Sequence, residues 1–228
     1  MSAINELREE LASTETAQFV TTMLRDISAT RLQSIRAAYE ANAAYFSELH
    51  VLMQLLQGYA TEKGITIPGV QKKRVLVALT SNRRFYGTLN DDVITALTQQ
   101  KAKSPDSDCF VIGNTGQQIV ERAGVLTASE YLSFKKDEPT AEEIHGVVTK
   151  LAQYSEVEVV HPTYINAFQQ NATVTDVTHV PNLAKPETQK SLEYLFEPDI
   201  PGMLEFFKTQ IRLVLFDRIV LETRLALT

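Results

Sequence analysis

Residues 1–60 read MSAINELREELASTETAQFVTTMLRDISATRLQSIRAAYEANAAYFSELHVLMQLLQGYA, with no proline and no glycine before Gly58. Apolar residues, among them Leu7, Ile35 and Leu49, recur through this stretch at steps of three and four, the period of an α-helix. A helix of this length measures roughly 80 Å, which exceeds the width of a domain formed by the rest of the chain. The pattern therefore predicts a helix that projects from the domain or pairs with another helix as a coiled coil.

Beyond residue 71 the pattern changes from one long helix to short alternating segments. Two continuous apolar runs, VLVAL at 75–79 and CFVIG at 109–113, are typical of strands that a parallel sheet buries on both faces. Further strands are expected at 131–134, 157–161, 164–174 (an edge strand) and 194–196, and helices at 89–101, 114–123 and 140–154. Strands that alternate with helices predict a Rossmann-like α/β domain with a mostly parallel sheet.

The last stretch, residues 200–228, is helical again and apolar around most of its circumference, so we expect other elements to cover it on more than one side. It reaches Thr228 without a glycine, proline or polar cap, and we expect the helix to be cut short there. The predicted organisation is a long helix at 1–60, an α/β domain at 72–198 and a second helix at 200–228. The two terminal helices are expected to pair as an antiparallel coiled coil.

Composition narrows the possible functions. The formal net charge is −6, which disfavours nucleic acid as a partner because phosphate binding needs a basic surface. The sequence shows no run of about 18 apolar residues and no signal peptide, so membrane association is expected only through a partner. The single Cys109 lies in an apolar run and is expected to be a buried small side chain rather than a nucleophile.

A search for a catalytic or ligand-binding pattern finds two weak candidates. The loop TSNRRFYG at 80–87 has a single glycine, so it is neither a G-x-G-x-x-G motif nor a P-loop; its Arg83 and Arg84 could bind an anion, but a protein contact is favoured. At 113–116, GNTG precedes a helix start, a geometry that attracts anions and that a tight turn explains equally well. The four histidines are scattered, and no G-x-S-x-G pattern occurs. We therefore expect no catalytic residue, no metal and no cofactor.

Five segments together resemble the gamma subunit of F-type ATP synthases, the central stalk of that rotary motor. They are QFVTTML (18–24), SNRRFYGTLN (81–90), IGNTG (112–116), VHPTYINAFQQ (160–170) and YLFEPD (194–199), and they follow in the family's order. The chain departs from the family pattern at Asn82, Arg84, Phe85 and Tyr86, where Asp, Gly, Leu and Cys are usual. It also stops at Thr228, where the family's last helix continues.

The resemblance implies a non-catalytic rotor subunit that couples proton or sodium flow through the c-ring to ATP synthesis or hydrolysis in the hexamer of alpha and beta subunits. The terminal helices would form a shaft inside the hexamer, and the domain a foot on the c-ring and an epsilon-type subunit. The complex would hold such a protein peripherally at the cytoplasmic face of the membrane. The residues it implies for subunit contacts are Gln18, Thr21, Met23 and Leu24 on the shaft, and Arg83 and Gly87 in the loop near the stator contacts.

Three alternatives stay open from the sequence. Met23 and Leu24 could pack only against the C-terminal helix. The chain could be a small-ligand-binding or regulatory α/β protein that dimerises through its terminal helices and holds an anion at 113–116. It could also be a gamma-like protein that assembles with a different ATPase ring or with none.

Overall fold

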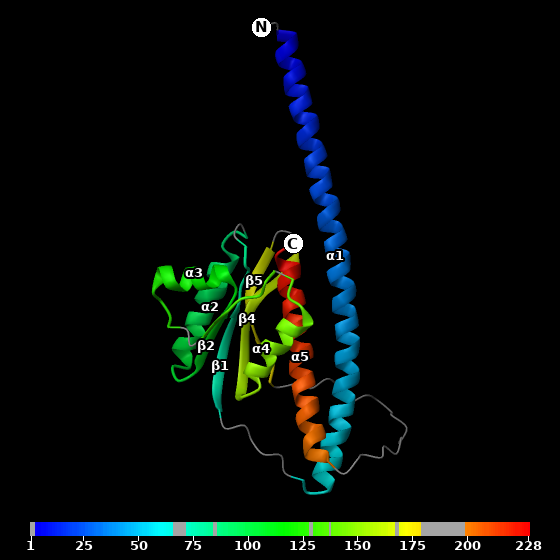
Figure 1. The fold of residues 1–228 in the computed structure, drawn as a ribbon, viewed down its shortest axis with the longest axis vertical. Helices are drawn as coiled ribbons and strands as arrows, with labels where there is room; N and C mark the ends of the chain where they lie inside the picture. The colour runs from blue at the N-terminus through cyan, green and yellow to red at the C-terminus, as the bar shows by residue number, and fades with distance from the viewer. Residues whose placement is uncertain are drawn as a thin grey trace.

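A computed structural model describes residues 3–65, 72–83, 86–127, 130–136, 138–166, 169–178 and 199–228. It shows a five-stranded sheet covered by helices on both faces, and one helix, α1, that extends far beyond the rest of the molecule (Figure 1). The helices are α1 (Ala3–Glu62), α2 (Leu89–Lys103), α3 (Asn114–Ala123), α4 (Ala141–Leu151) and α5 (Ile200–Ala226). The strands are β1 (Lys72–Leu79), β2 (Asp108–Ile112), β3 (Glu130–Leu132), β4 (Tyr154–Asn166) and β5 (Gln169–Asp176).

The sheet has the strand order β3-β2-β1-β4-β5, with β5 antiparallel to β4 and the other pairs parallel. Val77 of β1 lies opposite Phe110 of β2 and Val159 of β4, which fixes the register at the centre. Successive side chains point to opposite faces, so Val75 and Val77 pack toward α1, α4 and α5, and Leu76 packs toward α2 and α3. Because both faces are covered, the central strands are continuously apolar, and the predicted α/β fold class is confirmed.

The edge of the sheet differs from the expected single strand at 164–174. That prediction is wrong: β4 continues to Asn166 and β5 begins at Gln169, so the two form an antiparallel hairpin in which Tyr164 lies opposite Gln170. The hairpin was missed because strand-forming residues stand on both sides of its turn. β4 is long because β5 continues to pair with it beyond the parallel part of the sheet.

The helices predicted within the domain are confirmed, with changes at their ends. α4 opens with a capping box, in which the Glu143 amide donates to Thr140 Oγ1 (3.3 Å) and the Thr140 amide donates to Glu143 Oε2 (2.8 Å). Its predicted end at 154 is wrong, because Tyr154 begins β4 and donates its hydroxyl hydrogen to Asp108 Oδ2 at 2.7 Å. The strand predicted at 194–196 lies outside the described residues.

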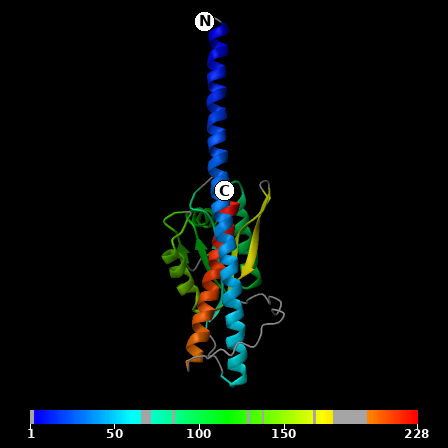
Figure 2. The same cartoon turned by 90° about the vertical axis from the view of Figure 1, so that its right-hand side faces the viewer.

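α1 and α5 lie side by side and run in opposite directions, as Figure 1 and Figure 2 both show. The buried residues of α1 that form this pairing recur at steps of four and three, the spacing of a coiled-coil seam. They are Asn42, Phe46, Leu49, Met53, Leu56 and Ala60. On its other sides α5 packs against β4 and α4, so its predicted coverage on more than one side is confirmed. Across the described parts of the chain, no helix is both long enough and apolar enough to cross a membrane.

Only part of α1 takes part in this pairing. We call residues 31–62 the inner half; they lie along α5 and the domain (Figure 2). We call residues 3–30 the outer half; in both views they extend past every other described element. The helix therefore divides into an anchored segment and a projecting one.

Candidate subunit interface

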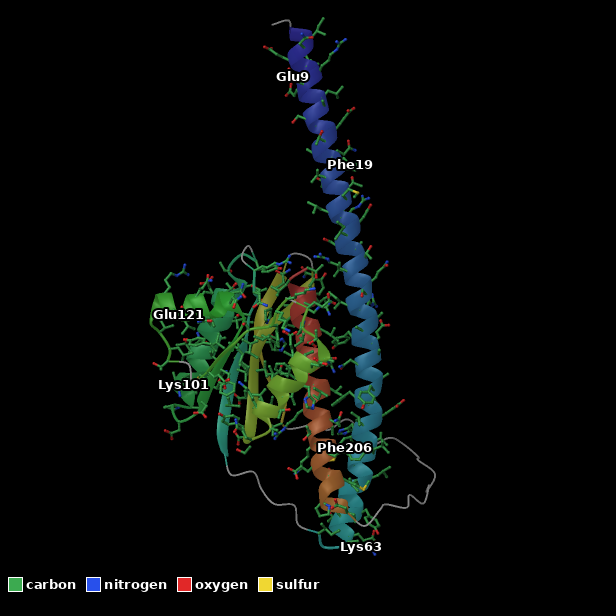
Figure 3. The ribbon with its side chains drawn as sticks, in the orientation of Figure 1. Glu9, Phe19, Lys63, Lys101, Glu121 and Phe206 are labelled. Carbon is green, nitrogen blue, oxygen red and sulfur yellow. The ribbon has the colours of Figure 1, made fainter. Side chains whose placement is uncertain are left out.

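The outer half of α1 carries apolar side chains that no other described element covers. Every residue from Ile4 to Ile27 is exposed, and Figure 3 shows Phe19 on the projecting helix, well clear of the domain. Eight large apolar side chains here are 47–70% exposed: Ile4, Leu7, Leu11, Phe19, Val20, Met23, Leu24 and Ile27. Exposed apolar surface of this kind is typical of sites that contact another protein or a membrane.

Five of these side chains lie close together, because residues three and four apart share one face of a helix. We call Phe19, Val20, Met23, Leu24 and Ile27 the outer patch. Two of them, Met23 and Leu24, were predicted from the sequence as contact residues. They are 49% and 59% exposed, so the alternative in which they pack only against the C-terminal helix is wrong for the described chain.

The stretch 11–24, which holds most of the outer patch, is weakly polar, whereas Arg25 and Asp26 beside it form an exposed ion pair at 3.1 Å. Three threonine hydroxyls donate to the carbonyl four residues earlier, each at 2.8 Å; they belong to Thr14, Thr16 and Thr21. The stretch 11–24 contains a single charged residue, Glu15. Gln18 and Thr21, the other two predicted contact residues of the shaft, are exposed in the same stretch. The stretch 11–24 is thus a weakly charged surface suited to a close protein contact.

The other two predicted contact residues, Arg83 and Gly87, lie in the loop between β1 and α2, at the carboxyl edge of the sheet. Both are exposed. Gly87 has a φ of +56°, a left-handed conformation that a side chain would strain, so it forms the turn into α2. The carbonyl of Arg83 accepts hydrogen bonds from Ser81 Oγ (2.6 Å) and Thr115 Oγ1 (3.0 Å). The structure thus separates the six predicted residues into a helical group and a loop group.

A buried polar network holds the start of this loop. The Ser81 amide donates to Asn90 Oδ1 (3.0 Å), and Asn90 Nδ2 donates to Ser81 Oγ (3.0 Å). Both side chains lie in the interior of the domain. Asn82 Nδ2 donates to the carbonyl of Phe134 (2.9 Å), which ties the loop to the segment after β3. The residues just before Arg83 are therefore fixed by side-chain hydrogen bonds.

The backbone amides of the GNTG turn at 113–116 already donate to other atoms of the chain. The first amides of α3 donate to acceptors in residues 80–82: Asn114 N to Asn82 Oδ1 (3.2 Å), Thr115 N to Ser81 O (3.1 Å) and Gly116 N to Thr80 Oγ1 (3.1 Å). A Cβ at Gly113 would lie 2.4 Å from the Thr80 carbonyl oxygen, and one at Gly116 would lie 2.5 Å from Thr80 Oγ1. The glycines therefore allow close packing, and an anion held at this turn, as the ligand-binding alternative requires, is not supported.

Sequence reasoning missed the polar contacts that fix α1 against α5. Asn42 Nδ2 donates to the Val214 carbonyl (3.1 Å) and to Asp217 Oδ2 (2.9 Å) within an otherwise apolar seam. The position of Asn42 in the apolar repeat could have predicted this contact, since a lone asparagine in such a seam often sets the register of paired helices. These bonds set how α1 sits along α5.

A second polar cluster lies nearer the outer half. The Tyr39 hydroxyl donates to Glu222 Oε1 (3.2 Å) and accepts from Arg218 Nη2, and the Arg218 guanidinium lies 4.9 Å from the Tyr39 ring centroid. Burial is the main cause that raises the pKa of Tyr39, so its hydroxyl stays protonated and remains a donor. The cluster joins α1 to α5 just before α1 leaves the domain.

Comparison with known proteins identifies the family. The ATP synthase family model matches residues 3–223. The ATP synthase gamma chain of Psychrobacter arcticus is 24% identical over 223 residues, which covers 90% of this chain and 76% of that one. The gamma chain of Flavobacterium johnsoniae is 24% identical over 215 residues, covering 87% and 72%.

A solved structure shares the fold. A chain of the central stalk and c-ring of the Tetrahymena thermophila mitochondrial ATP synthase superposes with a TM-score of 0.57 at 10% identity, over 88% of this chain and 93% of that one. At this identity the likeness concerns the fold alone, and the family rests on the sequence matches over nearly the whole chain. The chain belongs to the family of ATP synthase gamma chains, the stalk subunit of that complex and not an enzyme by itself.

Proposed function

We propose that this chain is the rotor shaft of a rotary ATP synthase, with the outer half of α1 inside the hexamer of alpha and beta subunits. The observation that carries the proposal is the exposed outer patch on a helix whose inner half is fixed to a rigid domain. A helix anchored in this way can transmit a turn of the domain to whatever surrounds its far end. Gln18, Thr21, Met23 and Leu24 are the contact residues proposed on the shaft.

The α/β domain, residues 72–198, is proposed as the foot that rests on the c-ring and an epsilon-type subunit. The Tetrahymena structure is one of a central stalk together with a c-ring, and we extend this arrangement to the present chain. Arg83 and Gly87 are proposed to face the stator side of the complex. The chain would then lie at the cytoplasmic face of the membrane, held there by the complex and not by a span of its own.

The mechanism follows from unequal contacts. As the shaft turns, each catalytic subunit meets a different side of α1, apolar at the outer patch and more polar elsewhere. A subunit whose conformations differ in their contact with that surface is shifted between them, and its nucleotide affinity shifts with it. Proton or sodium flow through the c-ring would drive the rotation, and the pairing of α1 with α5 would transmit that rotation from the domain to the outer half of α1.

Co-purification of a tagged chain from its own cells tests the proposal. The wild-type chain is expected to retain stoichiometric alpha and beta subunits of the ATP synthase. The double variant Met23→Glu with Leu24→Glu is expected to lose them, because it places two charges in a desolvated contact. The matched control is Ala37→Glu with Ala38→Glu, an adjacent and exposed pair on the inner half, which is expected to retain both subunits.

Two outcomes contradict the proposal. One is a wild-type chain recovered alone or as a homodimer, and the other is a Met23/Leu24 variant that retains the hexamer as well as the control does. ATP synthesis in membrane vesicles, driven by an imposed proton gradient or by a sodium gradient, then identifies the coupling ion. Both variants alter exposed side chains, so far-UV circular dichroism is expected to show unchanged helix content.

A further inference from the structure

A cavity of about 300 Å³ lies where α1 passes the carboxyl edge of the sheet. Four separate segments supply its charged walls. Arg31 comes from α1, Arg83 from the loop after β1, Lys136 and Glu138 from the segment between β3 and α4, and Arg224 from α5. Four cations and one carboxylate thus face one space, in a chain whose net charge is −6.

The cavity lies at the carboxyl edge of the sheet, the edge at which open α/β sheets bind ligands. The chain places β2 and β3 on one side of β1 and then crosses back to place β4 on the other, so the strand order reverses at β1. The loop that follows β1 and the segment that follows β3 leave the sheet at its carboxyl edge, and both line the cavity. Such a reversal leaves a crevice outside the ends of β1 and β4, the usual ligand site of this architecture, and the cavity borders this crevice on the side of β1.

The charges in the cavity are only partly neutralised. Arg224 forms an ion pair with Glu138. Arg31 and Lys136 form no ion pair with any carboxylate in the described parts of the chain. Cations that converge without counter-charges repel one another, and a multivalent anion relieves that repulsion. Guanidinium groups are especially suited to phosphate, because their planar fork can donate two parallel hydrogen bonds.

We propose that this cavity binds a small phosphate-bearing polyanion of the diphosphate class. A volume of about 300 Å³ is at the small end of ligand pockets, which favours a compact ion over a protein segment. The bound anion bridges α1, α5 and the two edge segments at the point where α1 leaves the domain. It therefore stiffens the base of the projecting helix. The site goes beyond the rotor role and does not depend on it.

Calorimetric titration of the full chain with inorganic pyrophosphate at low ionic strength tests the site. We expect saturable binding of one ion per chain, weakened by added salt, and a higher melting temperature in its presence. Arg31→Gln is expected to weaken binding about tenfold, the effect of losing one charge-assisted contact. Arg36→Gln is the matched control: it removes a cation five positions along the same helix, ion-paired with Glu40 and outside the cavity, and is expected to leave binding unchanged.

A second variant keeps the test independent of α1. Lys136→Gln is expected to weaken pyrophosphate binding to a similar degree, and since Lys136 has no ion pair among the described residues its loss should not affect folding. A titration with ADP distinguishes a nucleotide from a free diphosphate as the ligand. If ADP binds more tightly than pyrophosphate, the ligand is a nucleotide; if the two bind equally, the site recognises the diphosphate group alone. Either result supports the site. The proposal is overturned if no saturable binding occurs at millimolar pyrophosphate, if Arg31→Gln and Arg36→Gln bind alike, or if an oligoglutamate peptide binds the cavity more tightly than pyrophosphate does.

Discussion

The two halves of α1 form one continuous helix, yet they differ in what surrounds them. The inner half buries Phe46, Leu49, Met53 and Leu56 against α5 and the domain. The outer half has eight large apolar side chains, and all of them are exposed. Apolar periodicity therefore predicts a helix with an apolar face, but it does not show whether the same chain covers that face.

The halves also differ in their polar groups. On the inner half, Asn42 and Tyr39 send their hydrogen bonds across to α5. On the outer half, the threonine hydroxyls bond back to their own helix, as Thr21 does to the Ala17 carbonyl. Cross-helix bonds specify one partner in one register, whereas a surface with its polar groups internally satisfied can slide or turn against several. This contrast fits a helix that is fixed at one end and moves against its neighbours at the other.

Hydrogen exchange offers the largest contrast between the halves. In the isolated chain, amides at 46–60 are expected to open only with the whole domain, at a cost of about 5 kcal/mol or more. Amides at 5–25 should open locally and exchange orders of magnitude faster, because an isolated helix is held by its backbone alone. Mass spectrometry of peptides from each half measures the ratio. Similar protection in both would mean that the outer half is covered in solution.

The same substitution in each half gives the next largest effect. Leu56 is fully buried, so Leu56→Ala should lower the free energy of unfolding by about 2–5 kcal/mol. Leu24 is 59% exposed, so Leu24→Ala should change it by less than about 0.5 kcal/mol. Urea denaturation followed by circular dichroism checks both. A large loss for Leu24→Ala would show that the isolated chain already buries its outer patch, for example by self-association.

Much of the fold could be predicted from the sequence, because the apolar pattern of each central element favours one type of secondary structure. The run at 75–79 is apolar at every position, which is typical of a strand covered on both faces. The hairpin between β4 and β5 was missed because its turn interrupts no pattern: Tyr164 and Gln170 are both compatible with a half-buried strand. Where an element ends depends on a pairing partner far along the chain, and local pattern does not contain that information.

The candidate interface was predictable only in part. The resemblance to the gamma subunit selected Met23 and Leu24, but periodicity alone gave no reason to prefer Leu24 over the buried Leu49. Phe19, Val20 and Ile27 follow the same period and were not selected, because their exposure is known only once α5 is placed. The two interpretations of the turn at 113–116 were likewise equal in sequence, and the position of Thr80 decides between them.

A charge in the seam should have a smaller effect that depends on pH. Asn42→Asp turns a donor into a second carboxylate facing Asp217, whose Oδ2 lies 2.9 Å from Asn42 Nδ2, and should cost about 2 kcal/mol at pH 7. The pair raises one carboxyl pKa in the folded state, so the loss should shrink as pH falls and that group binds a proton. Gln18→Glu, the same kind of change on the exposed outer half, should cost less than about 0.5 kcal/mol. Urea midpoints at pH 7 and pH 4 test both, and an equal loss at the two pH values would count against the carboxylate pair.

The smallest effect is the titration of one buried histidine on the inner half. His50 is buried on α1; Gln54 Nε2 donates to its Nε2 at 2.9 Å, and its Nδ1 has no hydrogen-bond partner among the described residues. Burial lowers the pKa of His50, so between that pKa and the ordinary value of about 6.5 the unfolded chain binds a proton that the folded chain does not. The free energy of unfolding should therefore fall as pH drops below about 6.5, and His50→Gln should reduce this slope. Urea titrations from pH 7 to 5 measure this slope, and a His50→Gln slope equal to that of the wild-type chain would show that His50 does not contribute to it.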